Sequence, residues 1–391
     1  MKYKCLIFTM SSFLFMGNLY AQASLPLVPQ KSLPIEMPKI SEQAPPENKN
    51  DKFISLEDLK KIQKEQKKAN TIQPTPTSST TPTINDVNPS ADGYVLPKVE
   101  DNTEYKKEEL TFDRIKRNFL VSTAIDTKAE KNIPAIILLH PSEQTAENVW
   151  SQTTLPRFAK ESKYLLVAPQ ALNNHWNDGN MNPVSGEYKT TVDDVGFLIT
   201  LIDKLTHEYS VDPKKVFIVG ISNGGFMATH YVCRVGNSIR AGVNMLSLLH
   251  YDDSRRCTAS GVPWLSINSG NDAYIPYLGQ PRGRDNRGNP QDIWLSAEQT
   301  FNFFNTRNQC RQEGPYKQLP HFNKNDNTLA FIKIANNCAN GTSNILLAFR
   351  NAGHQLPNTH KNYGNPYEGL SNQDIDPGTA IIHFFNSVLK K

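Results

Sequence analysis

A serine at position 222 lies in the pattern G-x-S-x-G, which spans residues 220–224. The apolar run 216–219 precedes this pattern and a stretch suited to a helix follows it, so the serine stands where a buried strand passes into a helix. This arrangement is typical of a nucleophile elbow, in which glycines allow strand and helix to approach without colliding Cβ atoms. The chemistry it offers is nucleophilic attack by the Ser222 hydroxyl. The alternative is a chance match in which Gly224 and Gly225 only pack a tight junction.

A serine hydroxyl needs a base to accept its proton, so the pattern predicts a histidine and a carboxylate later in the chain. His354 is the expected general base, because it follows the predicted strand 345–349 at the sheet edge where the elbow opens. The other candidates have ordinary explanations as loop or packed imidazoles. They are His321 and His360 in polar loops and His383 in the last predicted helix.

The carboxylate that orients the histidine should follow another strand between the serine and the histidine. Asp272 meets this requirement, because it comes directly after the predicted strand 264–268. Asp252 and Asp253 also follow a strand and form the fallback pair, although turn or cap formation explains them equally. Asp193 and Asp194 precede the serine and begin a helix, where their charges favour the helix dipole.

The tetrahedral oxygen formed by such an attack must be met by N–H donors. The backbone N–H of Asn223 is the first expected donor. The second should come from the turn after the predicted strand 135–139, and Ser142 is the candidate because Pro141 has no N–H. His140 is expected to shape this turn.

Two tryptophans are candidates for the substrate pocket. Trp176 lies in the segment 174–177 and Trp294 at the start of the predicted helix 293–305, and buried packing explains either tryptophan at least as well. Acyl transfer by a serine needs no metal and no organic cofactor.

The N-terminal part of the chain is organised differently. Residues 1–23 combine two early lysines, an apolar centre and a small-residue cleavage site, which predicts a cleaved secretory signal. Residues 24–104 hold eleven of the 26 prolines and one glycine, which predicts a mostly disordered spacer, with one short helix near 55–69.

No later stretch reaches the roughly 18 apolar residues of a membrane helix. A net charge of +4 is too small to indicate nucleic-acid binding.

Four cysteines remain after removal of the signal, in a chain expected in an oxidising compartment outside the cell or in the periplasm. Two disulfides are the simplest expectation, and three connectivities are possible. Pairing between sequence neighbours gives Cys233 with Cys257 and Cys310 with Cys338, each worth about 3 kcal/mol in the chain-entropy model. Zinc is the competing explanation, but no C-x-x-C spacing occurs and no histidine lies at ligand spacing.

Residues 105–391 are expected to form one α/β domain that carries the site. Short, continuously apolar runs alternate with amphipathic stretches, which predicts a mainly parallel sheet covered by helices on both faces. The predicted strands are 135–139, 164–168, 216–219, 241–246, 264–268 and 345–349, and the predicted helices are 194–209, 225–233, 293–305 and 378–389.

Residues 112–391 resemble the secreted polyhydroxybutyrate depolymerase and feruloyl-esterase-like branch of the α/β-hydrolases. The resemblance rests on Leu139-His140, Asp193-Asp194-Val195-Gly196-Phe197, Val211-Asp212-Pro213, Gly220 to Met227, Gly270 to Pro276, and Gly353-His354 with Pro357. It implies an α/β-hydrolase fold and a serine esterase whose nucleophile, acid and base are Ser222, Asp272 and His354. Pro141 departs from the family pattern, which usually has glycine there, and no adsorption domain of the kind found in polymer-degrading members is visible.

The sequence therefore predicts a secreted serine esterase whose partner is an ester substrate, with polymers among the candidates. Polyhydroxybutyrate-type polyester or its oligomers are the first expectation, and feruloyl or acetyl esters of plant polysaccharide are the alternative. Two other classes stay open. One is a secreted binding or surface protein with a hydrolase scaffold, and the other is a peptidase that uses the same three residues.

Overall fold

The structure is a computed structural model that describes residues 104–179, 191–280, 294–357 and 369–390. The predicted signal sequence lies outside these residues. So does the predicted spacer up to residue 103, with its helix near 55–69.

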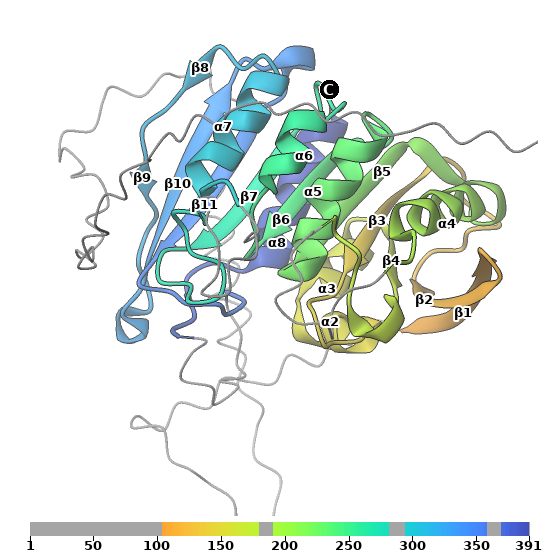
Figure 1. The fold of residues 1–391 in the computed structure, drawn as a ribbon. Helices are drawn as coiled ribbons and strands as arrows, with labels where there is room; N and C mark the ends of the chain where they lie inside the picture. The colour runs from red at the N-terminus through yellow and green to blue at the C-terminus, as the bar shows by residue number, and fades with distance from the viewer. Residues whose placement is uncertain (1–103, 180–190, 281–293, 358–368, 391) are drawn as a thin grey trace, which may run out of the picture. The chain divides into compact units, whose positions relative to one another are not determined.

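One mixed sheet organises the described residues (Figure 1). Its strand order is β1-β2-β4-β3-β5-β6-β7-β11-β10-β8, and β9 pairs with β10 off this path. The strands are β1 Tyr105–Phe112, β2 Ile115–Ser122, β3 Ile133–Leu139, β4 Leu165–Pro169, β5 Val211–Ile221, β6 Ala241–Met245, β7 Trp264–Ser269, β8 Gln312–Glu313, β9 Lys317–Gln318, β10 Leu329–Asn336 and β11 Asn344–Arg350. The strands from β4 to β11 in this order run parallel to one another, as the continuous apolar runs predicted.

The two ends of the sheet are antiparallel and were not predicted. At one end, β1 pairs with β2 as a hairpin, and β2 joins the parallel strands through β4. At the other end, β10 pairs with β11, and the short strands β8 and β9 pair with β10. β1 is mostly exposed and carries charged residues, so it lacks the continuous apolar run of a central strand. In β10, Lys333 interrupts the apolar sequence, and the residues of this strand are buried at some positions and partly buried at others.

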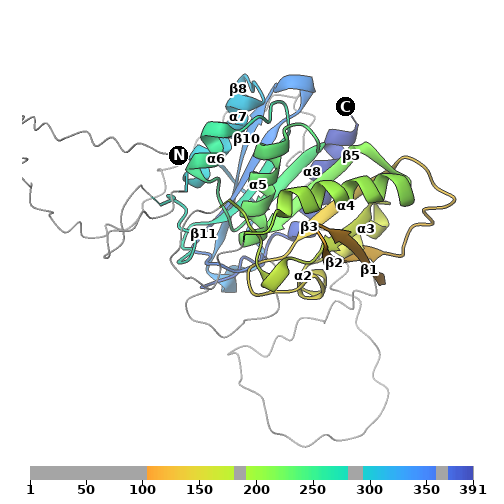
Figure 2. The same ribbon diagram turned by 45° about the vertical axis from the view of Figure 1, so that its right-hand side comes forward.

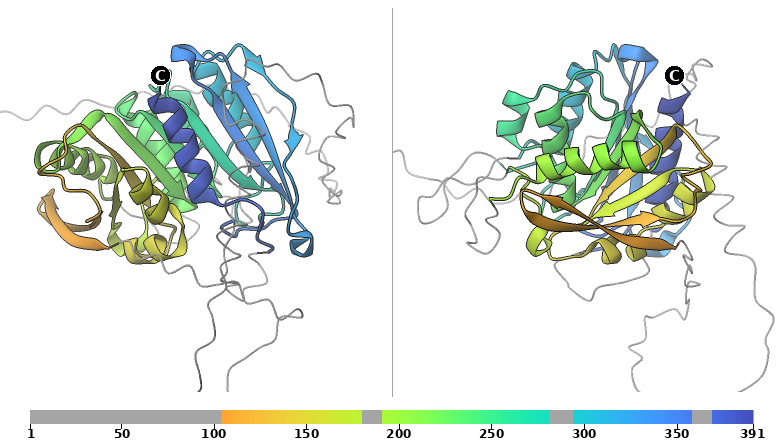
Figure 3. Two further views of the ribbon diagram at one scale, coloured as in Figure 1. Left: turned by 180° about the vertical axis from the view of Figure 1, so that it is seen from behind. Right: turned by 90° about the vertical axis from the view of Figure 1, so that its right-hand side faces the viewer.

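Helices cover both faces of the sheet. α4, α5, α6 and α7 lie on one face, and α8 with α3 lies on the other (Figures 1 and 3). α4 lies toward the β1–β2 end of the sheet (Figure 2). The helices are α2 Ala146–Gln152, α3 Leu155–Glu161, α4 Asp194–Glu208, α5 Asn223–Val235, α6 Tyr251–Arg256, α7 Ala297–Arg307 and α8 Pro377–Leu389, with short 3₁₀ turns η1 Leu172–Asn174, η2 Lys324–Asp326 and η3 Ala339–Gly341.

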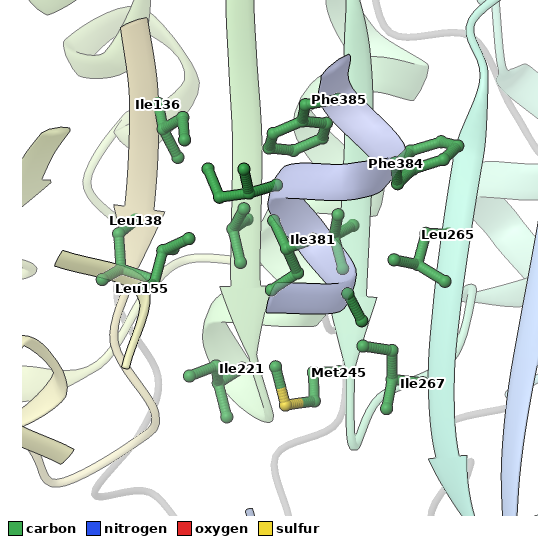
Figure 4. Packing of buried hydrophobic residues seen from close by; sticks show 14 of the residues in the cluster. Ile136, Leu138, Leu155, Ile221, Met245, Leu265, Ile267, Ile381, Phe384 and Phe385 are labelled. Carbon is green, nitrogen blue, oxygen red and sulfur yellow. The ribbon is translucent and has the colours of Figure 1, made fainter. Parts of the chain in front are cut away.

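Successive side chains of the central strands pack on opposite faces of the sheet. In β3, Ile136 and Leu138 belong to the apolar cluster beneath α8, whereas Ile137 and Leu139 belong to the cluster beneath α4 and α5. Figure 4 shows the first cluster, in which α8 side chains such as Ile381 face the strands. Both faces of these strands are therefore buried, and the strand ends that carry the polar residues of interest are held in a rigid layer.

The strand order, the parallel central strands, the helices on both faces and the turn at Ser222 are those of an α/β-hydrolase fold. The predicted fold class is thus confirmed. One predicted helix begins elsewhere: α7 starts at Ala297, because the Ser296 side chain caps the helix and Gln299 completes a capping box. Residue 293, where the prediction placed this helix start, lies outside the described residues.

Two disulfide bonds are present, between Cys233 and Cys257 and between Cys310 and Cys338. This is the neighbour pairing favoured by the sequence. The first joins the end of α5 to the residue after α6, and the second joins the segment after α7 to the residue before η3. No helix within the described ranges is long and apolar enough to cross a membrane.

Candidate active site

Ser222 lies at the turn between β5 and α5 with a backbone conformation that is rare for a residue with a side chain. Its φ is 53° and its ψ is −120°. The Ser222 N–H donates to the Met245 carbonyl at 2.8 Å, which holds the turn against the end of β6. A Cβ atom on Gly220 would overlap the Gly224 carbonyl, and one on Gly224 would overlap the Leu139 carbonyl. Glycine is therefore required at both positions for β5, α5 and the end of β3 to pack this closely.

His354 and Asp272 meet Ser222 in a chain of hydrogen bonds. His354 Nε2 is 3.1 Å from Ser222 Oγ, and His354 Nδ1 is 2.6 Å from Asp272 Oδ2. A carboxylate only accepts, so Nδ1–H donates to Asp272 and the Nε2 lone pair faces the Ser222 hydroxyl. The other Asp272 oxygen accepts from the N–H groups of Tyr274 and Ile275, and the Asp272 side chain is 2% exposed. The geometry allows Nε2 to take the serine proton.

The acid and base loops are also tied together through their backbones. The Gly270 N–H donates to the Phe349 carbonyl at 2.8 Å, and the Asn271 N–H donates to the Ala352 carbonyl at 2.9 Å. β7 and β11 are neighbouring parallel strands, so these bonds extend their pairing into the two loops. The separation between Asp272 and His354 is thus set by the sheet.

The fallback carboxylates have other partners. Asp253 accepts from His230 Nδ1 at 2.9 Å with each of its oxygens, and it lies with Asp252 in the first turn of α6. Asp193 caps α4 by accepting from the Gly196 N–H. Asp194 forms a buried ion pair with Arg117 at 2.6 Å.

The remaining candidate histidines lie apart from this hydrogen-bonded chain. His321 Nδ1 bonds Asp374 Oδ2 at 2.7 Å, and Asp374 also accepts two backbone N–H groups. His383 lies within α8. His360 lies outside the described residues.

The two expected oxyanion donors lie on neighbouring strand ends. Leu139 pairs with Gly220 across β3 and β5, so Ser142 and Asn223 follow adjacent strands at the same edge of the sheet. His175 lies between their side chains, with Nδ1 2.8 Å from Ser142 Oγ and Nε2 3.4 Å from Asn223 Nδ2. Local sequence patterns do not indicate this histidine, because it comes from a loop 33 residues from Ser142 and 48 residues from Asn223 in the chain.

Trp176 does not line a pocket, contrary to the prediction. Its side chain is fully buried, and its Nε1–H donates to the His140 carbonyl at 3.1 Å. Its backbone N–H donates to Asn223 Oδ1 at 2.8 Å. The indole therefore supports the segment after β3, whereas the Trp176 backbone holds the side chain of Asn223. With no exposed surface, the indole cannot touch a substrate directly.

Trp294 and Tyr274 are two aromatic residues of the described segments that keep exposed surface. Trp294 is half-buried and packs against Phe226 of α5 with ring centroids 5.3 Å apart. Its contact with substrate stays a prediction. Tyr274 is 48% exposed and meets the His354 ring edge to face at 5.3 Å. Sequence reasoning missed Tyr274, although its position two residues after Asp272 places it at the site.

His140 fixes the turn after β3, as expected from the sequence. Its Nδ1 is 2.7 Å from the Pro141 carbonyl, and its Nε2 accepts from the Ala171 N–H at 3.1 Å. A carbonyl only accepts and an N–H only donates, so the ring is neutral with its proton on Nδ1. Burial lowers the pKa of His140 to about 4.

Among the described residues, no group of three or more His, Cys, Asp or Glu side chains gathers where it could hold a metal ion. The arrangement of Ser222, His354 and Asp272 offers acyl transfer through the side chains themselves.

Comparisons with known proteins point to esterases and hydrolases. No protein-family model matches the chain. Feruloyl esterase B of Thermothelomyces thermophilus is 25% identical over 120 residues, which is 30% of this chain and 40% of that protein. Feruloyl esterase B of Piromyces equi is 24% identical over 246 residues, which is 61% of this chain and 42% of that protein. The chain spans less than half the length of these curated relatives.

Solved structures with partial similarity carry related names. A thermostable esterase is 18% identical, with a TM-score of 0.37, and the match covers 44% of this chain and 48% of that one. An S-formylglutathione hydrolase from Staphylococcus aureus is 11% identical, with a TM-score of 0.33, and the match covers 44% and 81%.

The buried, neutral His140 predicts a specific loss of stability in acid. The unfolded chain binds a proton near the ordinary pKa of 6.5, whereas the folded protein binds it only near pH 4. The free energy of unfolding should therefore fall as the pH drops from 6.5 to 4, by about 3 kcal/mol from this group. Urea unfolding at a series of pH values measures this fall.

The matched control is His140→Asn, whose amide can still donate to the Pro141 carbonyl but does not titrate. The variant should lose less stability than the wild type between pH 6.5 and 4. Parallel curves for the two proteins would contradict the role given to His140.

Proposed function

We propose that this protein is a serine esterase. The observation that carries the proposal is the hydrogen-bonded chain from Ser222 through His354 to Asp272, placed at the strand ends of an α/β-hydrolase fold. The names of the partial relatives support the same activity. A scaffold used only for binding has no need of a serine in so rare a conformation, aimed at a paired histidine.

In the proposed mechanism, His354 Nε2 takes the proton of Ser222 as Oγ attacks the ester carbonyl carbon. The Asn223 N–H and the Ser142 N–H stabilise the resulting oxyanion, and Asp272 stabilises the imidazolium. The bond to the alcohol then breaks, and the alcohol leaves with the proton from His354. Water, deprotonated by His354, attacks the acyl-enzyme and releases the carboxylic acid and free Ser222.

Polyhydroxybutyrate-type polyester, or its soluble oligomers, is the first substrate class that we propose. The elbow, acid and base segments that resemble the polyester-degrading branch support it. Feruloyl esters of plant polysaccharide are the second candidate, because the curated relatives are named feruloyl esterases. The half-exposed ring of Tyr274 beside His354 offers an apolar contact to either acyl group.

We also propose that the protein is secreted to the cell exterior or the periplasm. Its two disulfide bonds suit an oxidising compartment, and residues 1–23 have the composition of a signal sequence.

Replacement of the nucleophile tests the activity itself. Ser222→Ala should lower kcat for p-nitrophenyl butyrate by about 10⁴-fold or more, because no other group can form the acyl-enzyme. Ser151→Ala, which changes an exposed serine of α2, is the control and should match the wild type. Equal rates for the wild type and Ser222→Ala would contradict the esterase proposal and favour the binding-protein alternative.

Two aspartates that each bond a histidine allow a matched test of the acid. Asp272→Asn should lower kcat by about 10³ to 10⁴-fold, since an amide facing Nδ1 favours the wrong tautomer of His354. Asp253→Asn makes the same change at the His230 pair and should leave kcat within about twofold of the wild type. The opposite ranking of the two variants would overturn the assignment of Asp272.

A panel of substrates distinguishes the proposed classes. Product release should be measured from polyhydroxybutyrate, soluble hydroxybutyrate oligomers, feruloylated xylan and acetylated xylan, with Ser222→Ala as the blank. We expect the hydroxybutyrate substrates to be cleaved fastest. Faster release of ferulate would select the second class, and faster cleavage of an anilide than of its matched ester would identify a peptidase.

A further inference from the structure

The side chain of Asn223 is held in one orientation by its neighbours. Its Oδ1 accepts from the Trp176 N–H at 2.8 Å, and its Nδ2 donates to Asp178 Oδ2 at 2.8 Å and to the Trp176 carbonyl at 3.2 Å. A backbone N–H can only donate, and a carboxylate or carbonyl can only accept. The amide therefore cannot be flipped without breaking these contacts.

This orientation decides which nitrogen of His175 carries the proton. Asn223 Nδ2 also lies 3.4 Å from His175 Nε2, so its two hydrogens face three acceptor positions. The amide nitrogen has no lone pair to offer, and this contact therefore suits an Nε2 that carries no proton. Burial lowers the pKa of His175, so the ring carries a single proton at neutral pH. We therefore assign that proton to Nδ1.

The tautomer in turn orients the hydroxyl of Ser142. His175 Nδ1 is 2.8 Å from Ser142 Oγ, so Nδ1–H donates and Oγ accepts. A serine hydroxyl has one hydrogen of its own to donate. Within the described ranges, the bond from His175 is the one hydrogen bond of Ser142 Oγ, and it leaves the hydroxyl hydrogen available.

Ser142 lies in the segment from which the proposed mechanism takes its second oxyanion donor. It follows β3 at the sheet edge beside the elbow, and the Glu143 N–H donates to the Asn174 carbonyl at 2.8 Å, which anchors this segment to the loop that carries His175. The packing of Gly224 against the carbonyls of Leu139 and His140 brings the start of α5 to the same segment.

We propose that the Ser142 hydroxyl donates a hydrogen bond to the oxyanion, in addition to the backbone donors, and that His175 is the positioning residue that turns this hydroxyl toward it. The inference rests on the proposed esterase function. It adds a side-chain donor at the place where Pro141 departs from the family pattern.

Kinetics of Ser142 variants test the donor. Ser142→Ala keeps the backbone N–H and removes the hydroxyl, so kcat for p-nitrophenyl butyrate should fall by about 10²-fold. KM should stay within about threefold, because the bond forms in the transition state. Ser142→Thr restores a hydroxyl and should recover most of kcat.

Variants of His175 test the positioning role. His175→Ala should lower kcat by about tenfold, whereas His175→Asn, whose amide can replace Nδ1–H, should retain most of the activity. In the Ser142→Ala background, His175→Ala should cause no further loss, because it acts through a hydroxyl that is already absent.

The outcomes separate this inference from the esterase proposal. An active wild type, an inactive Ser222→Ala and a Ser142→Ala variant as fast as Ser151→Ala would overturn the hydroxyl donor and leave the esterase intact. If the fall in kcat of the double variant equals the product of the two single-variant falls, the two residues act independently and the positioning role of His175 is overturned. An inactive wild type would overturn the proposed function and this inference with it.

Discussion

The rest of the site depends on the backbone of Ser222. A φ of 53° with a ψ of −120° is costly for serine, about 1 to 3 kcal/mol, and the turn keeps it because β5 and α5 are packed too closely for any other path. The glycines at 220 and 224 permit that packing, and the bond to the Met245 carbonyl fixes it to β6. One local conformation thus aims the hydroxyl and presents the N–H of Asn223.

Two groups of contacts complete the site around this turn. On one side, neighbouring parallel strands deliver Asp272 and His354, and backbone bonds between their loops set the spacing. On the other side, a partly buried polar network runs through the side chains of Asn223, His175 and Ser142. His140 and Trp176 lie next to this network: His140 is a neutral imidazole, and the buried Trp176 indole donates to its carbonyl.

The central strand ends, and the residues Ser222, Asp272 and His354 that follow them, could be predicted from local sequence patterns. Each of the three follows a buried strand whose apolar run is visible in the chain. β1 was missed because it is mostly exposed and carries charged residues, and β10 was missed because Lys333 interrupts its apolar sequence. The predicted substrate contact of Trp176 was wrong, because the sequence around a tryptophan does not show whether its side chain is exposed to solvent. The His175 network depends on contacts 33 and 48 residues apart, and no local pattern encodes it.

The most direct test of the central claim is covalent labelling of the active serine. The full chain would be treated with an alkyl fluorophosphonate, digested, and mapped by mass spectrometry. We expect a single adduct on Ser222, formed far more slowly in His354→Ala. No adduct, or an adduct on another residue while Ser222 stays unmodified, would contradict it.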